Sequence, residues 1–287
     1  MNNSLYYWDG LPNFGDVLNK MLFERVFNAD LNYTTQILNA GCLGIGSILD
    51  QLVKEESKVY FIKQLIRLFL FSRNNKVSVL GAGFHYEKDK IKFIKKLDFQ
   101  IVRGELSKKI LIKNKLIKQD GVLTGDPGLL ASYMYTNKKD KKYALGIIPH
   151  LGDLNSVLFY EIHKKYKKSV IINVQDHPDK VISEIMECEN IISSSLHGLI
   201  ISDSLNIPNV WVENRYKTGV CEPHFKFFDY YSALDFNCAA PADLFKFLDY
   251  DLDYIKINYK IDYNKVQKKQ NELYVFLKNY FNKELRK

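Results

Sequence analysis

The sequence predicts an α/β protein made of two Rossmann-like domains whose parallel sheets face a central cleft. Apolar runs of strand length alternate with helical patterns along the chain, which is typical of parallel βαβ units. At 287 residues the chain is long enough for two modest domains. The lysine-rich segment 137–142 has few apolar residues and separates them. We therefore expect an N-terminal domain over residues 1–140 and a C-terminal domain over residues 141–287.

The first half contains short apolar runs, each followed by small or functional residues. The runs expected to form strands are 5–8, 36–39, 77–80, 99–102 and 122–123. The turns that follow them are 13–16, 41–46, 81–83, 103–104 and 125–127. Because parallel strands end along one edge of a sheet, we expect these turns to line the edge at which open α/β sheets bind ligands.

The second half repeats this arrangement. Its expected strands are 143–148, 170–174, 190–193 and 209–212, and their ends lead into His150, His177, the turn 193–197 and the loop 213–226. The tail 262–286 has apolar residues at helical spacing, which predicts an amphipathic helix that packs back across both domains. Two halves with their ligand turns facing each other have the layout of GT-B-type transferases, so the predicted fold is GT-B-like.

The segment 191–211, IISSSLHGLIISDSLNIPNVW, predicts a buried strand, a helix with His197 in its first turn, and a second strand. Ser194 or Ser195 can cap this helix, and the backbone N–H groups around Leu196 then point beyond the strand end. Gly198 leaves room for a close approach. The segment therefore indicates an anion site beside His197, or else a capped core helix whose histidine makes a single hydrogen bond.

Composition and charge limit the classes of partner. Hydrophobic residues make up 46% of the chain, which excludes global disorder. The net charge of +8 comes from scattered lysines and fits small anionic substrates or an acidic membrane surface. No basic-aromatic stripe or nucleic-acid module is present, so nucleic acid is not an expected partner.

The four cysteines, Cys42, Cys188, Cys221 and Cys238, have neither CxxC nor disulfide-framework spacing. We expect reduced thiols and no zinc or other metal site. The N-terminus has no signal-peptide pattern, which predicts a cytoplasmic location. The apolar segment 59–71 is interrupted by Lys63 and Arg67 and is too short to cross a bilayer. It fits a helix on a membrane surface or an ordinary core-facing helix.

The ordered motifs resemble those of the polysaccharide pyruvyl transferase family, in particular its exopolysaccharide branch of succinoglycan-type ketal pyruvyl transferases. The motifs are NFGD, GxGSIL, LGAGF, VRGELS, GDPGLL, IPH, SSSLHGLIISDSLNIPNVW and KFFDYYSAL, and they extend from about residue 6 to about residue 234. Members transfer a pyruvyl group from phosphoenolpyruvate to two hydroxyls of a sugar, which yields a cyclic ketal and phosphate. The resemblance implies this activity, with phosphoenolpyruvate as donor substrate and no cofactor.

The resemblance also assigns the central residues. Arg103, in the VR motif, is expected to contact the donor, and its guanidinium can grip a phosphate or carboxylate bidentately. His197 matches the histidine of the LHG motif. As a group that titrates near neutrality, it can protonate the donor methylene or deprotonate the sugar hydroxyl, and the sequence leaves both roles open. Many members have Arg-Leu-His here, whereas this chain has Ser195-Leu196-His197; Ser195, the helix N-terminus and Lys226 are together expected to replace that arginine.

The remaining candidates lie at other strand ends. Asn13, Gly15 and Asp16 follow the first strand, and Asp16 either acts on an acceptor hydroxyl or simply caps a helix. His150 is expected to reach the cleft from the second domain. Asp126 is expected to form a turn. The FFDYY segment after Lys226 belongs either to the site or to aromatic packing.

Two other functions remain open. A GT-B-type glycosyltransferase that uses a nucleotide sugar would share the cleft, but the chain has no convincing segment for ribose and base recognition. A non-catalytic polysaccharide-binding subunit would not need Asn13, Asp16, Arg103 and His197 together. For the transferase, we expect a lipid-linked sugar acceptor at the inner face of the cytoplasmic membrane, with peripheral contact to anionic lipid.

Overall fold

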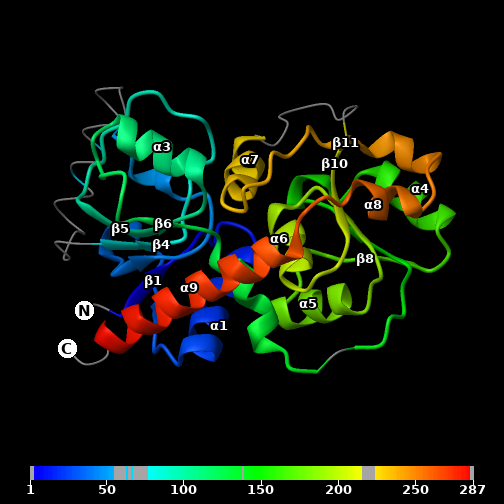
Figure 1. Cartoon of the computed structure of the whole chain (residues 1–287), viewed down its shortest axis with the longest axis horizontal. Helices are drawn as coiled ribbons and strands as arrows, with labels where there is room; N and C mark the ends of the chain where they lie inside the picture. The colour runs from blue at the N-terminus through cyan, green and yellow to red at the C-terminus, as the bar shows by residue number, and fades with distance from the viewer. Residues whose placement is uncertain are drawn as a thin grey trace.

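The computed structural model describes residues 3–54, 77–137, 139–214 and 224–284, together with Lys63 and Ile66. These residues form two sheets in which every pairing between the named strands is parallel (Figure 1). The first sheet has the order β2-β1-β3-β4-β5-β6 and the second has the order β11-β10-β9-β7-β8. The predicted fold class, a GT-B-like α/β protein with two Rossmann-like parallel sheets, is therefore confirmed.

The strands are short, and β3, β4, β7 and β9 are fully buried, as expected for parallel sheets covered on both faces. Those of the first sheet are β1 (Ser4–Tyr6), β2 (Asn32–Tyr33), β3 (Cys42–Leu43), β4 (Val77–Leu80), β5 (Leu97–Val102) and β6 (Leu123–Thr124). Those of the second sheet are β7 (Leu145–Ile148), β8 (Ser169–Ile171), β9 (Ile191–Ser193), β10 (Asn209–Glu213) and β11 (Ala242–Asp243). The predicted domain boundary at 140/141 lies between β6 and β7 and remains a prediction.

The helices connect and cover these strands. The α-helices are α1 (Phe14–Phe27), α3 (Glu105–Lys113), α4 (Val157–Lys165), α5 (Pro178–Met186), α6 (Leu196–Ser204), α7 (Phe225–Ser232), α8 (Asp253–Asn258) and α9 (Tyr263–Glu284). Five 3₁₀ segments are also described: η1 (Ile37–Asn39), η2 (Leu49–Leu52), η3 (Pro127–Met134), η4 (Leu151–Asp153) and η5 (Leu244–Leu248). Among the described residues we find no helix that is both long and apolar enough to cross a bilayer.

One strand prediction was wrong. Residues 37–39 form η1, and the strand is Cys42–Leu43, inside the glycine-rich segment that we expected to be a turn. This strand pairs with both β1 and β4, so its two residues are buried by neighbours on each side. A central strand of two residues between glycines gives no apolar run in the sequence, which explains the error. The predicted segment 59–71, apart from Lys63 and Ile66, and Cys221 lie outside the described residues.

In both sheets the order in which strands are added reverses at the first strand. In the first sheet β1 lies between β2 and β3, and in the second sheet β7 lies between β8 and β9. The next strand in sequence lies on one side of this first strand, and the strand after that lies on its other side. At such a point a crevice opens at the carboxyl ends of the strands, where open α/β sheets bind ligands. The fold therefore supplies two candidate crevices, at β1/β3 and at β7/β9.

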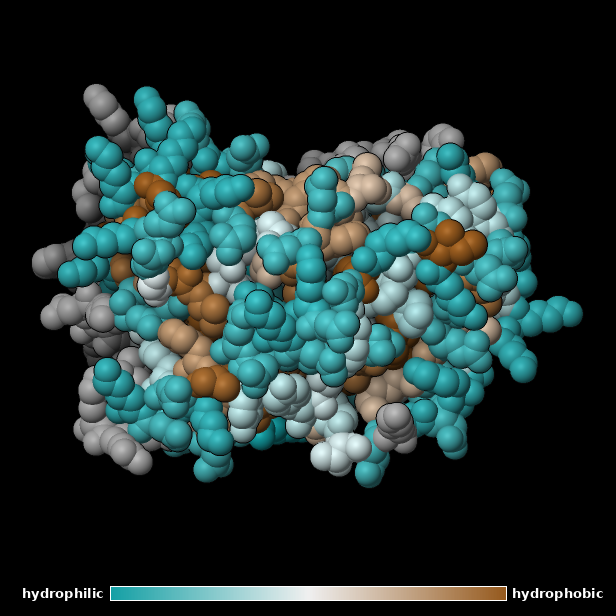
Figure 2. All heavy atoms as spheres, in the orientation of Figure 1, coloured by the Kyte–Doolittle hydropathy of each residue, from teal (hydrophilic) through white to brown (hydrophobic). Residues whose placement is uncertain are grey.

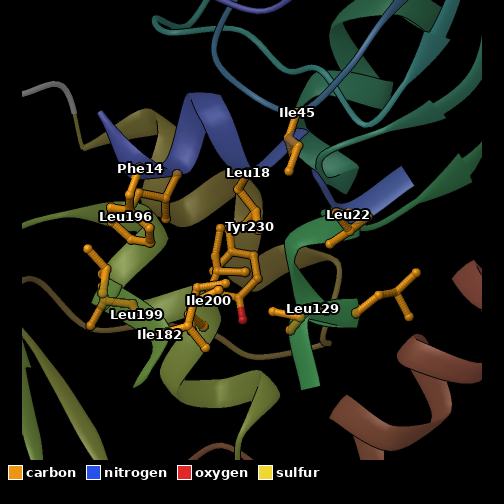
Figure 3. Close-up of a cluster of buried hydrophobic side chains, with 14 of the residues drawn as sticks. Phe14, Leu18, Leu22, Ile45, Leu129, Ile182, Leu196, Leu199, Ile200 and Tyr230 are labelled. Carbon is orange, nitrogen blue, oxygen red and sulfur yellow. The ribbon is translucent and has the colours of Figure 1, made fainter. Parts of the chain in front are cut away.

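A shared hydrophobic core joins the two halves (Figure 3). Phe14, Leu18 and Leu22 of α1 belong to the same buried cluster as Leu129 of η3 and Leu199 of α6. The amide of Phe14 also donates a hydrogen bond of 2.7 Å to the carbonyl of Val174, across the junction of the halves. The crevices are therefore held in a fixed relation by continuous packing.

Helix α9 adds a second connection. It contacts α1, α6 and η3, and Figure 1 shows it running from the second half toward the first. Its buried residues include Val266, Leu273 and Leu277, and Gln270 Nε2 donates to the carbonyl of Leu129 at 2.8 Å. Mostly hydrophilic side chains cover the molecule on this side (Figure 2). The tail thus folds as the amphipathic helix that its spacing predicts.

Candidate active site

A pocket of about 300 Å³ opens where the two crevices meet, and both halves of the chain line it. Its lining residues are Trp8, Asn13, Asp16, Gly46, Ser47, Ile48, Gln51, His85, Arg103, Asp126, His150, Leu151, Ser195, Leu196, His197 and Lys226. Most of the residues expected from the sequence are therefore brought together. Gly15, Ser194 and Gly198 were also expected there, but they do not line this pocket.

The N-terminus of α6 faces the pocket at the end of β9. Ser193 Oγ accepts a hydrogen bond from the amide of Ser195 at 3.0 Å and so fixes the turn into the helix. Ser195 is the N-cap residue, yet its side chain makes no capping hydrogen bond within the described part of the chain. The first N–H groups of α6, beginning at Leu196, have no intrahelical acceptor. This end of the pocket is therefore suited to bind an anion.

Ser194 has a supporting role instead of the expected contact with substrate. Its Oγ donates to Asp153 Oδ2 at 2.8 Å and accepts from the amide of His150 at 2.8 Å. The Nδ1 atom of His150 accepts in turn from the amide of Gly152 at 3.2 Å, so a neutral His150 carries its proton on Nε2. Ser194 thus holds the loop that brings His150 to the pocket.

The two glycines serve packing and not ligand approach. A Cβ at Gly198 would lie 2.5 Å from Ser193 Oγ and 3.1 Å from the Ile148 side chain, so this glycine lets α6 sit against the ends of β7 and β9. A Cβ at Gly15 would lie 2.0 Å from Nδ1 of His197. Any side chain at Gly15 would therefore displace the imidazole, and this glycine positions His197.

His197 does not titrate near neutrality, contrary to the expectation from sequence. Burial lowers its pKa to about 3, and the positive charges of Lys226 and Arg103 and the nearby His150 lower it further in the same direction. Its Nε2 is buried and has no hydrogen-bond partner among the described residues. His197 is thus a neutral imidazole with one ring nitrogen left for a ligand.

Asp16, and not His197, has a pKa near neutrality. Asn13, not Asp16, caps α1, because Asn13 Oδ1 accepts from the amide of Gly15 at 3.0 Å. Burial raises the pKa of Asp16 to about 7; Lys226 opposes this shift and Asp9 adds to it. Asn19 Nδ2 donates to the carbonyls of Asp16 and Ile45, at 3.0 and 3.1 Å, and so holds the first turn of α1 against the glycine-rich turn after β3. Asp16 is therefore a fixed carboxyl group that can gain or lose a proton near pH 7.

Arg103 lies in the pocket wall with its guanidinium held from three sides. It is 1% exposed; its Nε donates to Asp229 Oδ2 at 3.0 Å, its Nη1 donates to Ser47 Oγ at 2.7 Å, and its Nη2 donates to the carbonyl of Phe84. Asp229 also accepts from the amide and the hydroxyl of Ser107, at 2.8 and 2.6 Å. Several N–H groups of the Arg103 guanidinium thus donate to protein acceptors, and the carboxylate of Asp229 balances the guanidinium charge.

Sequence reasoning did not single out Asp229 or Ser47. The signal for Asp229 was an acidic residue inside an otherwise aromatic segment, since an acid buried among apolar residues requires a cationic partner. A Cβ at Gly104 would lie 1.7 Å from the Asp229 carbonyl oxygen, so the glycine after Arg103 permits α7 to approach. The VRG motif is therefore a docking site for α7 as well as a source of positive charge.

Helix α7 contributes to both the site and the core. Lys226 is 7% exposed, lines the pocket and lowers the pKa of both Asp16 and His197. Phe227 stacks on Trp211 with 4.2 Å between ring centroids, and Tyr230 is fully buried. Phe227 and Tyr230 of the FFDYY segment thus pack in the core, as the packing interpretation expects, whereas Lys226, which precedes the segment, lines the pocket.

Asp126 forms the turn expected from the sequence, because its Oδ1 accepts from the amide of Gly128 at 2.8 Å. Its Oδ2 is buried without a partner among the described residues, and the residue lines the pocket. Burial raises its pKa to about 7, a shift that the positive charge of Arg103 opposes. A second protonatable carboxyl group thus lies in the wall beside Arg103.

The arrangement suits a small, multiply charged anion and proton transfer to or from it. A helix N-terminus, Lys226 and Arg103 supply positive potential. His197 is neutral while Asp16 titrates near pH 7, and groups with such separated pKa values are typical of acid–base sites. Within the described ranges, no three His, Cys, Asp or Glu side chains lie close enough together to hold a metal ion.

Comparison with known proteins identifies relatives. The Uncharacterized protein L143 of Acanthamoeba polyphaga mimivirus is 32% identical over 175 residues, which are 59% of this chain and 58% of that protein. Two structures of the wall teichoic acid polymerase TagF cover 100% and 99% of this chain and 89% and 88% of theirs, at 10% identity and TM-scores of 0.47 and 0.48. The two parallel sheets themselves define the fold.

The motifs of the chain receive independent support. The family described as polysaccharide pyruvyl transferase matches residues 13–216, which is more than half of the 287 residues. The matched range includes Asn13, Asp16, Arg103, His150 and His197, all of which line the pocket. The resemblance to this family is confirmed, without a distinction between its branches, and the chain belongs to the polysaccharide pyruvyl transferase family.

Proposed function

We propose that the protein transfers a pyruvyl group from phosphoenolpyruvate to two hydroxyls of one sugar, which gives a pyruvate ketal and inorganic phosphate. The observation that carries this proposal is the pocket at the meeting point of the two crevices, with α6, Lys226 and Arg103 around the uncharged His197. Phosphoenolpyruvate has a phosphate and a carboxylate, so it needs several fixed donors in one small space. Family membership supports a transferase that acts on polysaccharides.

The reaction needs two proton transfers and no change of oxidation state. The methylene carbon of the donor gains a proton and becomes a methyl group. The adjacent carbon forms two C–O bonds to sugar oxygens and loses its bond to the phosphate oxygen. The two sugar hydroxyls lose two protons in total. One of them restores the acid that protonated the methylene carbon, and the other leaves on the phosphate. The site must therefore contain an acid near the methylene and a base near the sugar hydroxyl.

The pKa values suggest which group has which role. Bound next to His197, the phosphate and carboxylate would raise its pKa from about 3, because nearby negative charge favours imidazolium. His197 would then be protonated, as a general acid must be, only when the donor is bound. We therefore assign it as the acid. Asp16, with a pKa of about 7, is assigned as the base for the acceptor hydroxyl. Ser195, Leu196, His150, Arg103 and Lys226 are assigned to donor binding, and Asn13 supports Asp16.

The acceptor is proposed to be a sugar of a surface polysaccharide or of its lipid-linked precursor at the inner face of the cytoplasmic membrane. The charge of +8 would favour weak contact with anionic lipid, at about 1 kcal/mol per nearby cation. Screening by salt makes such contact reversible. Sedimentation with anionic vesicles at low but not high salt is the expected result; no sedimentation at any salt concentration would favour an acceptor free in solution.

The donor is tested by thermal stabilisation. A ligand that binds only the folded state raises its stability by about 2.7 kcal/mol at a hundredfold excess over Kd. Phosphoenolpyruvate should raise the melting temperature of the purified protein, and a panel of nucleotide sugars should not. The opposite pattern would favour the nucleotide-sugar glycosyltransferase, and the same titration after exhaustive chelation tests whether a metal is required.

Arg103→Lys should weaken donor binding. Lysine keeps the charge but loses the planar fork that contacts Asp229, Ser47 and Phe84, so the remaining N–H groups would no longer be held toward the pocket. We expect the Kd for phosphoenolpyruvate to rise by about tenfold or more, measured by titration calorimetry. Equal affinities in a folded variant would remove Arg103 from the donor site.

Asp16 should control the pH dependence of the reaction. Its carboxyl group must be ionised to accept a proton, so kcat/KM should fall as pH decreases through about 7 and reach a plateau above it. Asp16→Asn should lower the rate by about a hundredfold and abolish this acidic limb. Asp126→Asn is the matched control, since Asp126 also has a pKa near 7. If the limb disappears in the Asp126 variant and persists in the Asp16 variant, the assignment is wrong.

A further inference from the structure

The two ends of the pocket differ in chemistry. The end from the second half, with Ser195, Leu196 and Lys226, offers the N–H groups at the start of α6 and a positive charge. From the first half, Trp8, Ile48, Gln51 and His85 line the pocket, and we call these four residues the first-half wall. The first half also contributes Asn13, Asp16, Gly46, Ser47, Arg103 and Asp126 to the lining. Burial is the main cause of the raised pKa of Tyr6, Tyr7 and Asp16, and the negative charge of Asp9 on this side raises each pKa further. An anionic donor is therefore disfavoured at the first-half wall, whereas a neutral ligand is not.

Trp8 is a fixed aromatic surface at this wall. A Cβ at Gly10 would lie 2.4 Å from Cζ2 and 2.8 Å from Cε2 of the indole, so the ring packs directly on the Gly10 backbone. Trp8 is only half-buried and also lines the pocket. An indole supported from one side and open to a pocket provides a large apolar contact at low cost in side-chain entropy.

Hydrogen-bonding groups surround this surface. The Tyr6 hydroxyl donates to Gln51 Oε1 at 2.7 Å, which orients the Gln51 amide and directs its Nε2 donors elsewhere. The Gln51 side chain lines the pocket together with His85 and with Asp16, the proposed base. A flat apolar face with a few oriented polar groups at its edge is the usual form of a site for a small polar molecule.

From this combination we infer that the first-half wall is the acceptor subsite, in which a neutral pyranose stacks its C–H face on Trp8. Gln51 binds hydroxyls of the sugar ring, and the hydroxyl that Asp16 deprotonates lies toward Asp16. This inference rests on the proposed function and adds to it the class of the acceptor unit and the residues that hold it. The donor lies at the α6 end, so the reacting carbon and the sugar hydroxyls meet between His197 and Asp16.

Intrinsic fluorescence tests the subsite without turnover. The chain has two tryptophans, and Trp211 is buried and stacked on Phe227, so a ligand on the first-half wall should change mainly the emission of Trp8. Methyl glycosides of glucose, galactose and mannose and oligosaccharides built from them are the probes. We expect a saturable change in wild-type emission with at least one probe and no such change in Trp8→Phe. If none of the probes alters the emission of Trp8, the subsite is refuted.

Steady-state kinetics supply the second arm. Trp8→Ala should raise the KM for the glycan by about tenfold or more and leave the KM for phosphoenolpyruvate within about twofold, with partial recovery in Trp8→Phe. Gly10→Ala keeps the indole but displaces it, so it should raise the glycan KM as well. Tyr86→Ala is the control, because Tyr86 is 50% exposed nearby and does not line the pocket.

The two arms separate this inference from the proposed function. Glycan-dependent emission without phosphate release from phosphoenolpyruvate would retain the subsite and refute the proposed reaction. Phosphate release with an unchanged glycan KM in Trp8→Ala would retain the reaction and refute the subsite. An increase in the KM for phosphoenolpyruvate alone would place the donor, not the acceptor, on Trp8.

Discussion

Replacing His197 with alanine is expected to lower the rate of phosphate release by at least about a hundredfold, the usual contribution of a general acid–base group. The substitution removes the ring whose Nε2 is buried in the pocket without a partner among the described residues. His197→Gln fills more of the space beside Gly15 and should be equally slow, because an amide cannot exchange the proton. Single-turnover phosphate release measures the effect, and circular dichroism verifies that each variant is folded.

The control for this substitution is His177→Ala. His177 is 64% exposed and caps α5, away from the pocket. Its replacement should leave turnover unchanged and cost only about 1 kcal/mol of stability, as for other N-caps. Near-normal turnover in a folded His197 variant would exclude His197 from the mechanism.

The second large effect is expected from Asp229→Ala, which should reduce the free energy of unfolding by about 3–5 kcal/mol. Removing this carboxylate leaves Arg103 as a buried charge without its partner, since the two side chains are 1% and 0% exposed. The amide and hydroxyl of Ser107 lose their acceptor at the same time. Urea unfolding of the whole chain, followed by circular dichroism, measures the loss.

Asp179→Ala provides a matched comparison, because Asp179 also pairs with an arginine across the two halves. The Arg25–Asp179 pair is 44% and 39% exposed, so solvent screens it and its loss should cost about 1 kcal/mol or less. A loss in Asp229→Ala no greater than that in Asp179→Ala would contradict the view that the buried pair holds α7 against the pocket.

The fold could be predicted where the strands have a sequence signal. Strands β4, β7, β9 and β10 are largely buried and apolar, and β5 contains Phe99, Ile101 and Val102 between polar residues. The predicted positions of these five strands agree with the structure to within two residues at each end. Strands β2, β3 and β11 have only two residues each and are stabilised by pairing with neighbouring strands. Local sequence carries little information about such strands, because pairing and not propensity stabilises them.

The site was predictable where function depends on strand ends. Asn13, Asp16, Arg103, His150 and His197 all follow strands, and the topology brings such positions to the carboxyl-end edge of each of the two sheets. Trp8, Ser47, Gln51, His85 and Asp229 were not singled out, because their places depend on how turns and α7 pack in three dimensions. The pKa of His197 was predicted wrongly for the same reason: it is set by burial and by Lys226 and Arg103, which a spacing pattern does not reveal.

The central claim is that this pocket joins phosphoenolpyruvate to a sugar, and the most direct measurement follows both products of one reaction. The whole protein is incubated with phosphoenolpyruvate and the glycan panel, phosphate is quantified, and the glycans are analysed by mass spectrometry. We expect phosphate release that requires a glycan, persists after chelation and accompanies a glycan mass increase of one pyruvic acid less one water. A glycan that instead gains a hexose from an added nucleotide sugar, while phosphoenolpyruvate stays intact, would contradict the account.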